Sequence, residues 1–269
     1  MKVAVIISGQ MRDYKINITN HMKHLIEPNQ ADVFVYACNK NTIHSLGQST
    51  SQRYNVTSVE SSEALENQVK KQYGKSLIEV QTNSEEELSD DNFGTLGYFK
   101  KRMNNQMTNI RKCFEMAISH SDKEGFEYDF IVRLRPDNSM LPQKVDISSF
   151  DCREGLIHST VYPSGHRDPW FFSFSKPNTF QKYCSFEYMK GADESRTDNN
   201  FDCPEVSLEK YLISIDLTTN LHQSICRPFY EYDKTKPIFE FPHVNWEEKL
   251  LDPTGEWVEI SNKGEKSTK

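Results

Sequence analysis

The feature that most constrains this sequence is a strand, helix, strand pattern within residues 2–38. Lys2–Ile7 is a short apolar run typical of a buried strand, and Asp32–Cys38 is a second one. Between them, Tyr14–Glu27 carries apolar residues at helical spacing. Strands joined through a helix in this way pair in parallel with a right-handed crossover. The sequence therefore predicts an α/β fold around a mostly parallel sheet.

A second strong pattern begins at Gly97, which opens the longest predicted helix. Its apolar residues recur at spacings of three and four, as in Phe99, Met103, Met107, Ile110, Phe114 and Ala117. Such a stripe is typical of a helix face packed on a core, so we expect this helix beside the strand that follows it. That strand is Phe130–Leu134. Arg135-Pro136-Asp137 ends it, because proline cannot donate to a ladder and restricts the residue before it.

The remaining elements follow from shorter patterns. Helices are predicted at 62–73, at 177–189 and from Pro204 onward. Strands are predicted at 77–81, 155–162, 169–175 and 225–230, and loops at 39–55, 84–92 and 191–200. No internal repeat and no long linker divides the chain, so we expect one domain.

Composition excludes several classes of protein. The chain has 269 residues and a net charge of −7, which argues against a general nucleic-acid binder. Its mean hydropathy is −0.71, and no apolar run approaches the roughly 20 residues of a membrane span. Six scattered cysteines without a C-x-x-C pair fit reduced thiols. The apolar run at 2–7 is too short for a signal peptide, so we expect a cytoplasmic location.

The first candidate site follows the strand at 130–134. Asp137 lies at the carboxyl end of this strand, which is where ligands bind in open α/β sheets. A carboxylate there suits a divalent cation that carries phosphates, because Mg²⁺ is usually held by one or two carboxylates plus phosphate oxygens. The structural alternative is an Asp-Asn turn that closes the strand, with Arg133 or Arg135 paired to a neighbouring acid.

The second candidate site is the predicted loop Ser8-Gly9-Gln10-Met11-Arg12 after the first strand. Gly9 would allow the backbone to approach a ligand closely, and the planar guanidinium of Arg12 would meet a phosphate. The alternative is a tight turn between a strand and a helix. The loop is not a Walker loop and the chain has no G-x-G-x-x-G, which disfavours a P-loop NTPase and a Rossmann dehydrogenase.

Two acids in the second half are candidates for contacts with a sugar. Asp168 lies in a predicted turn before Trp170, where a carboxylate and an aromatic ring would hold a sugar. Its alternative role is to start an Asp-Pro turn. Glu205 opens a helix and would be a general base if it lay within about 3 Å of an acceptor hydroxyl. Its alternative role is a capping box with Asp202.

Histidines and nucleophiles give weaker signals. His21 and His24 lie three positions apart on the first predicted helix. Because no acid partner is apparent, we expect them to be surface residues rather than metal ligands. No Ser-His-Asp or Cys-His arrangement has a recognisable local context, so the sequence does not favour covalent catalysis by a nucleophilic side chain.

Taken in order, these pieces resemble glycosyltransferases of the GT-A type. More narrowly they resemble the WavE-like enzymes of bacterial lipopolysaccharide and capsule synthesis and related proteins of giant viruses. The resemblance covers roughly residues 1–215. The matching residues are Ser8-Gly9-Gln10-Met11-Arg12, Asp32-Val33-Phe34-Val35, Lys123-Glu124-Gly125-Phe126-Glu127, the strand from Tyr128 to Asp137, Asp168 and Pro204-Glu205.

The resemblance implies a GT-A-like single domain over residues 1–252. A central, mostly parallel twisted sheet would be flanked by helices, with a smaller sheet on the acceptor side. Residues 1–138 would form the nucleotide-binding half and residues 139–252 the acceptor half. The composition of residues 253–269, which is rich in Gly, Ser and Lys, independently predicts a flexible tail there.

The resemblance also implies an activity, the transfer of a sugar from a nucleotide-sugar donor to a glycan or a lipid-linked acceptor. A lipid-linked acceptor would bring the protein into peripheral contact with a membrane. The donor would be bound by Ser8, Gly9, Gln10, Arg12, Arg133 and Arg135, and Asp137 would hold Mn²⁺ or Mg²⁺. Glu205 would be the catalytic base of an inverting reaction, with Asp168 as the second candidate.

One position departs from the pattern of the family. GT-A enzymes commonly carry an Asp-x-Asp motif, and Arg135 stands here in place of its first acid. Either Arg135 itself neutralises the diphosphate, or a metal relies on Asp137 together with the phosphates.

Two other functions remain open at this point. A nucleotidyltransferase also places a carboxylate-held metal at a strand end, but it releases pyrophosphate and usually has a glycine-rich loop with Lys or Arg after its first strand. A carbohydrate-binding or scaffolding domain of the same fold would keep the architecture without catalysis. Such a domain should bind a glycan and ignore the nucleotide.

Overall fold

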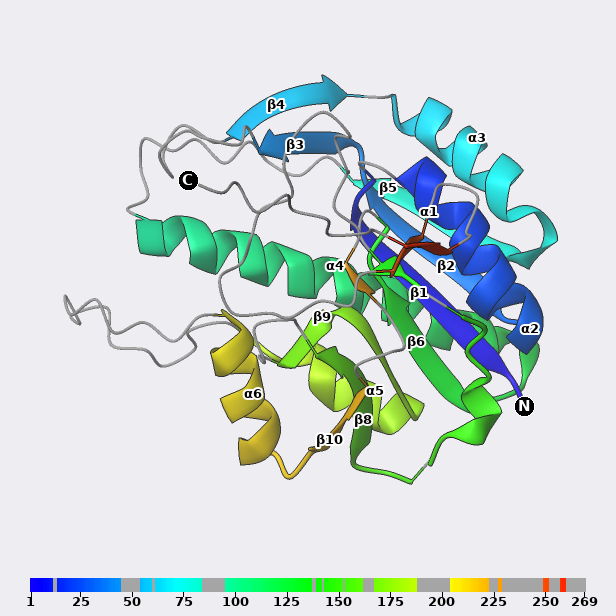
Figure 1. The fold of residues 1–269 in the computed structure, drawn as a ribbon, viewed down its shortest axis with the longest axis vertical. Coiled ribbons are helices and arrows are strands. Elements are labelled where there is room, and N and C mark those ends of the chain that lie inside the picture. The colour runs from blue at the N-terminus through cyan, green and yellow to red at the C-terminus, as the bar shows by residue number, and fades with distance from the viewer. Residues whose placement is uncertain are drawn as a thin grey trace, which may run out of the picture.

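A seven-stranded sheet forms the centre of the protein, with strand order β10-β8-β9-β6-β1-β2-β5 (Figure 1). The computed structural model describes residues 1–11, 14–44, 54–59, 61–83, 95–136, 139–141, 143–151, 153–161, 167–187, 204–222, 227–228, 249–251 and 257–259. The strands of the sheet are β1 Val3–Gln10, β2 Asp32–Cys38, β5 Leu77–Asn83, β6 Phe130–Leu134, β8 Leu156–Val161, β9 Arg167–Ser175 and β10 Thr218–His222.

The sheet is mostly parallel. β5, β2, β1 and β6 form a block of adjacent parallel strands. β9 runs antiparallel to both β6 and β8, and β10 is parallel to β8. The strands of the second half therefore continue the main sheet, while a small separate pair joins β7 Ser139–Met140 to β11 Arg227–Pro228. The predicted α/β class with a mostly parallel central sheet is confirmed.

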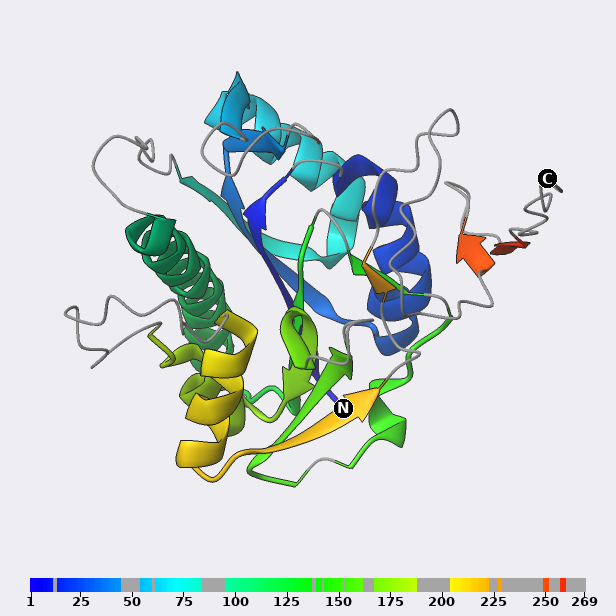
Figure 2. The same ribbon diagram turned by 60° about the vertical axis from the view of Figure 1, so that its left-hand side comes forward.

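Helices cover both faces of this sheet, as Figure 2 shows. The first face carries α1 Tyr14–His21, the π-helical turn η1 Met22–Ile26, α2 Glu27–Asn29 and α3 Ser62–Tyr73. The second face carries α4 Thr95–Glu124, α5 Pro177–Cys184 and α6 Pro204–Ser214. The fold thus has three layers, with the sheet in the middle.

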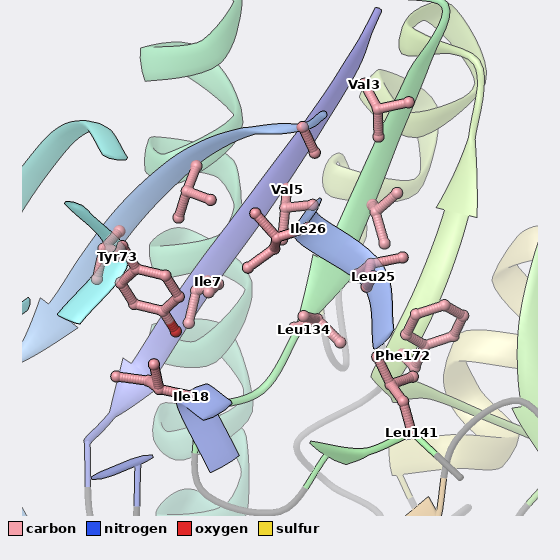
Figure 3. Close-up of a cluster of buried hydrophobic side chains, with 14 of the residues drawn as sticks. Val3, Val5, Ile7, Ile18, Leu25, Ile26, Tyr73, Leu134, Leu141 and Phe172 are labelled. Carbon is pink, nitrogen blue, oxygen red and sulfur yellow. The ribbon is translucent and has the colours of Figure 1, made fainter. Parts of the chain in front are cut away.

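Alternation along the strands divides the core into two clusters. On β1, Val3, Val5 and Ile7 face the first layer of helices, where they meet residues such as Leu25 and Ile26 (Figure 3). Ala4 and Ile6 face the second layer. Successive side chains of a strand point to opposite faces, so a strand covered on both sides reads as a continuous apolar run.

Several predicted elements match the structure closely. β2, α3 and β6 have the predicted bounds. α4 exists as predicted, and Met107, Ile110, Phe114 and Ala117 of its stripe are buried. It packs mainly over β1 and β2 rather than beside β6. In addition, β1 continues through Ser8–Gln10, which the sequence analysis assigned to a loop.

Two predictions about irregular segments differ from the structure. The expected loop at 39–55 is wrong at 40–44 and 54–55, because β3 Lys40–His44 pairs antiparallel with β4 Tyr54–Val59, and residues 45–53 lie outside the described ones. β10 was not predicted, since its residues Thr-Thr-Asn-Leu-His lack an apolar pattern and gain their order from pairing with β8.

Smaller elements complete the described chain. η3 Gly74–Ser76 and η5 Ile147–Ser149 are 3₁₀ turns. β12 Lys249–Leu251 pairs antiparallel with β13 Trp257–Glu259, and β13 lies inside the range 253–269 that was expected to be a tail. The division into a nucleotide-binding half, an acceptor half and a tail stays a prediction.

Candidate functional site

The strand order reverses at the border of β1 and β6. From β1 the chain passes through α1 to β2 and on to β5, whereas the connection through α4 brings it back to β6 on the other side of β1. In open α/β sheets, ligands bind outside the carboxyl ends of the strands at such a reversal. The carboxyl edge at this border is therefore where the topology favours a ligand.

β1 extends beyond β6 at this edge. The last pair in their register joins Ile7 to Leu134, and among the described strands Ser8–Gln10 pair only with β2. Gly9 has a φ of +121°, and a Cβ added to it would meet no atom of the described residues within 4 Å. L side chains rarely adopt this conformation, but glycine does so at little cost. At Gly9 no side chain among the described residues therefore covers the Cα position.

The residues on either side of Gly9 differ in burial. Ser8 is buried, and within the part of the chain that the structure describes its Oγ has no hydrogen-bond partner. Gln10 is half-buried. An unsatisfied buried hydroxyl destabilises a fold by about 1–3 kcal/mol, and such groups in native proteins call for an explanation. Ser8 thus adds a hydroxyl with unused bonding capacity to this edge.

The two arginines of the β6 segment have different environments. Arg133 has no exposed surface, and in the sheet register it lies between Ile6 of β1 and Ser173 of β9. Burial raises the pKa of the Cys113 thiol of α4 to about 12. Backbone hydrogen bonds at Ile7 and Tyr36 and the charge of Arg133 oppose this rise, so the guanidinium lies close enough to the thiol to act on it. Arg135, just past the end of β6, is half-buried. Arg135 is therefore accessible at the edge, whereas Arg133 is enclosed beneath the helices of the second face.

A hydrogen bond joins the segments that leave β1 and β6. Asn17 of α1 donates from Nδ2 to the carbonyl oxygen of Pro136 at 3.0 Å. α1 begins at Tyr14, shortly after β1 ends, and Pro136 follows shortly after β6. The predicted phosphate contact Arg12 and the predicted metal ligand Asp137 lie outside the described residues, so their roles stay predictions.

The backbones of the two predicted catalytic acids lie toward the same edge. Asp168 belongs to β9 and pairs with Thr160, rather than lying in the predicted turn. β9 is antiparallel to β6 and Phe172 pairs with Leu134, so Asp168 lies past the carboxyl end of β6. Glu205 is near the start of α6. The end of α6 leads to the beginning of β10 at the amino edge, so the start of α6 lies toward the carboxyl edge. The side chains of both acids lie outside the described ones.

The helix beside this border carries buried histidines that the sequence analysis placed on the surface. That expectation is wrong, since His21 and His24 are buried. The segment after β7 covers this side of the helix, and the Val145 amide donates to the His24 carbonyl at 2.8 Å. Histidines interleaved with Ile18 and Leu25 were the available signal for a buried polar face. Burial lowers the pKa of His24, and the charge of Lys23 lowers it further.

Buried histidines make stability depend on pH. Burial lowers the pKa of both His24 and His158 below 6.5. The unfolded chain therefore binds protons first as the pH falls. We expect the free energy of unfolding to decrease from pH 6.5 down to the lowered pKa values, by at most about 1.4 kcal/mol per pH unit for each histidine. Above pH 6.5 this contribution is fully present.

Urea unfolding between about pH 7.5 and pH 5.5 measures this dependence. The double variant His24→Gln, His158→Gln is expected to lose most of the slope. A slope that remains unchanged in the double variant would assign the pH dependence to other groups.

Two further observations bound the site. Among the described residues, no helix is long and apolar enough to cross a membrane. Within the same residues, no three His, Cys, Asp or Glu side chains group closely enough to hold a metal ion. The expected cytoplasmic location stays a prediction.

No protein-family model matches this chain, and no curated protein sequence matches it.

Proposed function

We propose that this protein is a glycosyltransferase of the GT-A type that binds a nucleotide-sugar donor at the border of β1 and β6. The observation that carries the proposal is the main chain at Gly9, where the described residues leave space open at the carboxyl end of β1. Backbone N–H groups that no side chain shields are suited to bind a diphosphate. The neighbouring Arg135 adds a planar guanidinium, which matches phosphate oxygens.

The proposed reaction is a single displacement. The diphosphate of the donor lies along Ser8–Gln10, and Arg135 stabilises the charge that develops as the bond between sugar and phosphate breaks. The acceptor hydroxyl attacks the anomeric carbon from the opposite face and forms the new glycosidic bond. Glu205 takes the hydroxyl proton, with Asp168 as the alternative base. The nucleoside diphosphate leaves with the electron pair of the broken bond, and the anomeric configuration inverts.

A divalent cation is not required by this scheme. Mn²⁺ or Mg²⁺ would supply additional neutralising charge, and Asp137 is the residue predicted to hold it. The described residues of this border, Ser8, Gly9, Gln10 and Arg135, offer no carboxylate, and a guanidinium repels a cation. These residues do not fit a metal site. A metal requirement therefore stays a prediction that depends on Asp137.

A panel of sugar nucleotides tests the activity. We expect one donor to bind in titration calorimetry and to be converted to its nucleoside diphosphate, by transfer to an acceptor or by slow hydrolysis. Release of pyrophosphate would identify a nucleotidyltransferase instead. Binding of a glycan without any nucleotide would identify a non-catalytic carbohydrate-binding domain. If no sugar nucleotide binds, with Mn²⁺ or without, the proposal is wrong.

The Arg135→Ala variant tests the proposed diphosphate contact. Charge-assisted hydrogen bonds contribute about 1.5–3 kcal/mol, so we expect donor affinity to fall about 10- to 100-fold. Arg135→Lys keeps the charge without the planar fork, so its donor affinity should lie between those of Arg135→Ala and the unmodified protein. Arg153→Ala is the control, because Arg153 is exposed and paired with Asp151 before β8. Donor affinity that is equal in all four proteins would exclude this role for Arg135.

A further inference from the structure

Two asparagines of α1 hold the chain where it leaves β6. Asn17 and Asn20 have exposed fractions of 0% and 4%. Asn17 donates to the carbonyl oxygen of Pro136 at 3.0 Å. Asn20 donates to the carbonyl oxygen of Leu141 at 2.9 Å and accepts from the Leu141 amide at 2.8 Å. One helix face therefore fixes both Pro136 and Leu141.

A third asparagine makes the same kind of contact farther along. Asn29, at the end of α2, donates to the carbonyl oxygen of Val145 at 2.7 Å and accepts from the Ile147 amide at 3.0 Å. Its exposed fraction is 8%. At 1.5 Å per helical residue, Asn29 lies about 18 Å from Asn17. Since α1 starts at the carboxyl edge of β1 and the helix runs back toward the start of β2, Asn29 lies at the opposite edge of the sheet.

Burial of these side chains has a specific effect. A buried amide is unfavourable unless its hydrogen bonds are made, whereas an apolar side chain would bury this helix face without that requirement. The asparagines instead define which turn of the helix meets the backbone groups of Pro136, Leu141, Val145 and Ile147. Leu141 itself belongs to the apolar cluster of the first face, together with Leu134 and Phe172 (Figure 3). Apolar packing holds the segment, and the asparagines set its register.

We propose that Asn17 is a positioning residue for the donor site. Its hydrogen bond to the carbonyl oxygen of Pro136 holds the residue that directly follows Arg135, and it does so from the helix that begins just after β1. The proposal rests on the proposed function, and it assigns to Asn17 the relative placement of Arg135 and Gly9. Asn29 also donates from its side-chain amide to a backbone carbonyl oxygen, but it lies at the far edge, where we expect no such effect.

Matched alanine variants separate positioning from stability. Asn17→Ala and Asn29→Ala each remove at least one buried hydrogen bond, so both should lower the urea midpoint of unfolding. Only Asn17→Ala is expected to lower affinity for the nucleoside diphosphate of the accepted donor, at least tenfold. With Asn29→Ala, affinity and kcat/KM should stay within twofold of the unmodified protein. Equal affinities in the two variants would overturn the proposal.

Hydrogen exchange on the unmodified protein gives a test that needs no variant. Saturation with the nucleoside diphosphate is expected to slow exchange of the Leu141 amide, which Asn20 holds, and to leave the Ile147 amide unchanged. Equal effects on the two amides would contradict the assignment. If the unmodified protein binds no sugar nucleotide or nucleoside diphosphate, the proposed function fails and this inference fails with it. If it binds and Asn17→Ala behaves like Asn29→Ala, only the positioning role fails.

Discussion

Replacing Gly9 with alanine is expected to weaken binding of the nucleotide sugar at least tenfold while the protein remains folded. At a φ of +121° an alanine is strained by about 1–3 kcal/mol. Relief of that strain rotates the adjacent peptides away from the orientation that faces the diphosphate. The added methyl group also occupies the open space beside β1. Titration calorimetry measures the affinity, and urea unfolding shows that the fold is kept.

Gly74→Ala is the matched control for this experiment. Gly74 also has a positive φ, of +53°, and a Cβ added to it would also meet no atom within 4 Å. It precedes β5 and therefore lies at the amino edge of the sheet. We expect a comparable loss of stability and no change in affinity. Wild-type affinity in Gly9→Ala, or the same loss of affinity in both variants, would contradict a donor site at Gly9.

Replacing Phe34 with alanine is expected to lower the free energy of unfolding by about 3–5 kcal/mol, the largest effect on stability predicted here. Phe34 is fully buried in β2 beneath α4. Its ring meets that of Tyr128 edge-on at a centroid distance of 6.2 Å. Its carbonyl oxygen accepts from the Cys113 thiol of α4 at 3.3 Å. Truncation leaves a cavity at the contact that holds α4 on the sheet. Urea unfolding measures the loss.

Two variants calibrate that measurement. Phe34→Leu keeps much of the buried volume and should lower the free energy of unfolding by less, about 1–2 kcal/mol. Phe126→Ala removes a half-buried ring from the same aromatic group and should also lower the free energy of unfolding by less than Phe34→Ala. If Phe34→Ala lowered stability no more than Phe126→Ala, the packing of α4 over β2 would be wrong.

The parts of the fold that the sequence predicted correctly are those with a local signal. β2 and β6 are apolar runs bounded by polar residues or proline, and α3 and α4 show helical periodicity. Both kinds of pattern arise because a buried face must be apolar. β10 and the β3–β4 pair have no such face in their sequence. β10 is a strand because it pairs with the distant β8, and β3 and β4 are strands because they pair with each other. The pattern of their side chains does not reveal this backbone pairing.

The candidate site could be predicted only in outline. Strand ends and Pro136 indicated the edge, and the glycine after the first apolar run indicated a close backbone approach. The sequence did not distinguish Arg133 from Arg135, because only the packing of the helices on the second face encloses the first and leaves the second accessible. It also gave no sign of Asn17, whose partner Pro136 is 119 positions away. Contacts between a side chain and a distant backbone leave no periodic pattern.

The most direct test is an amide-resolved NMR titration of the isotope-labelled protein with nucleoside diphosphates of different bases. The account predicts that one of them shifts the amide signals of Gly9, Gln10 and Arg135 and leaves those of Gly74 and Gly125, at the amino edge, unchanged. Saturating ligand that shifts none of the first three, or that shifts chiefly the two amino-edge glycines, would contradict a donor site at the border of β1 and β6.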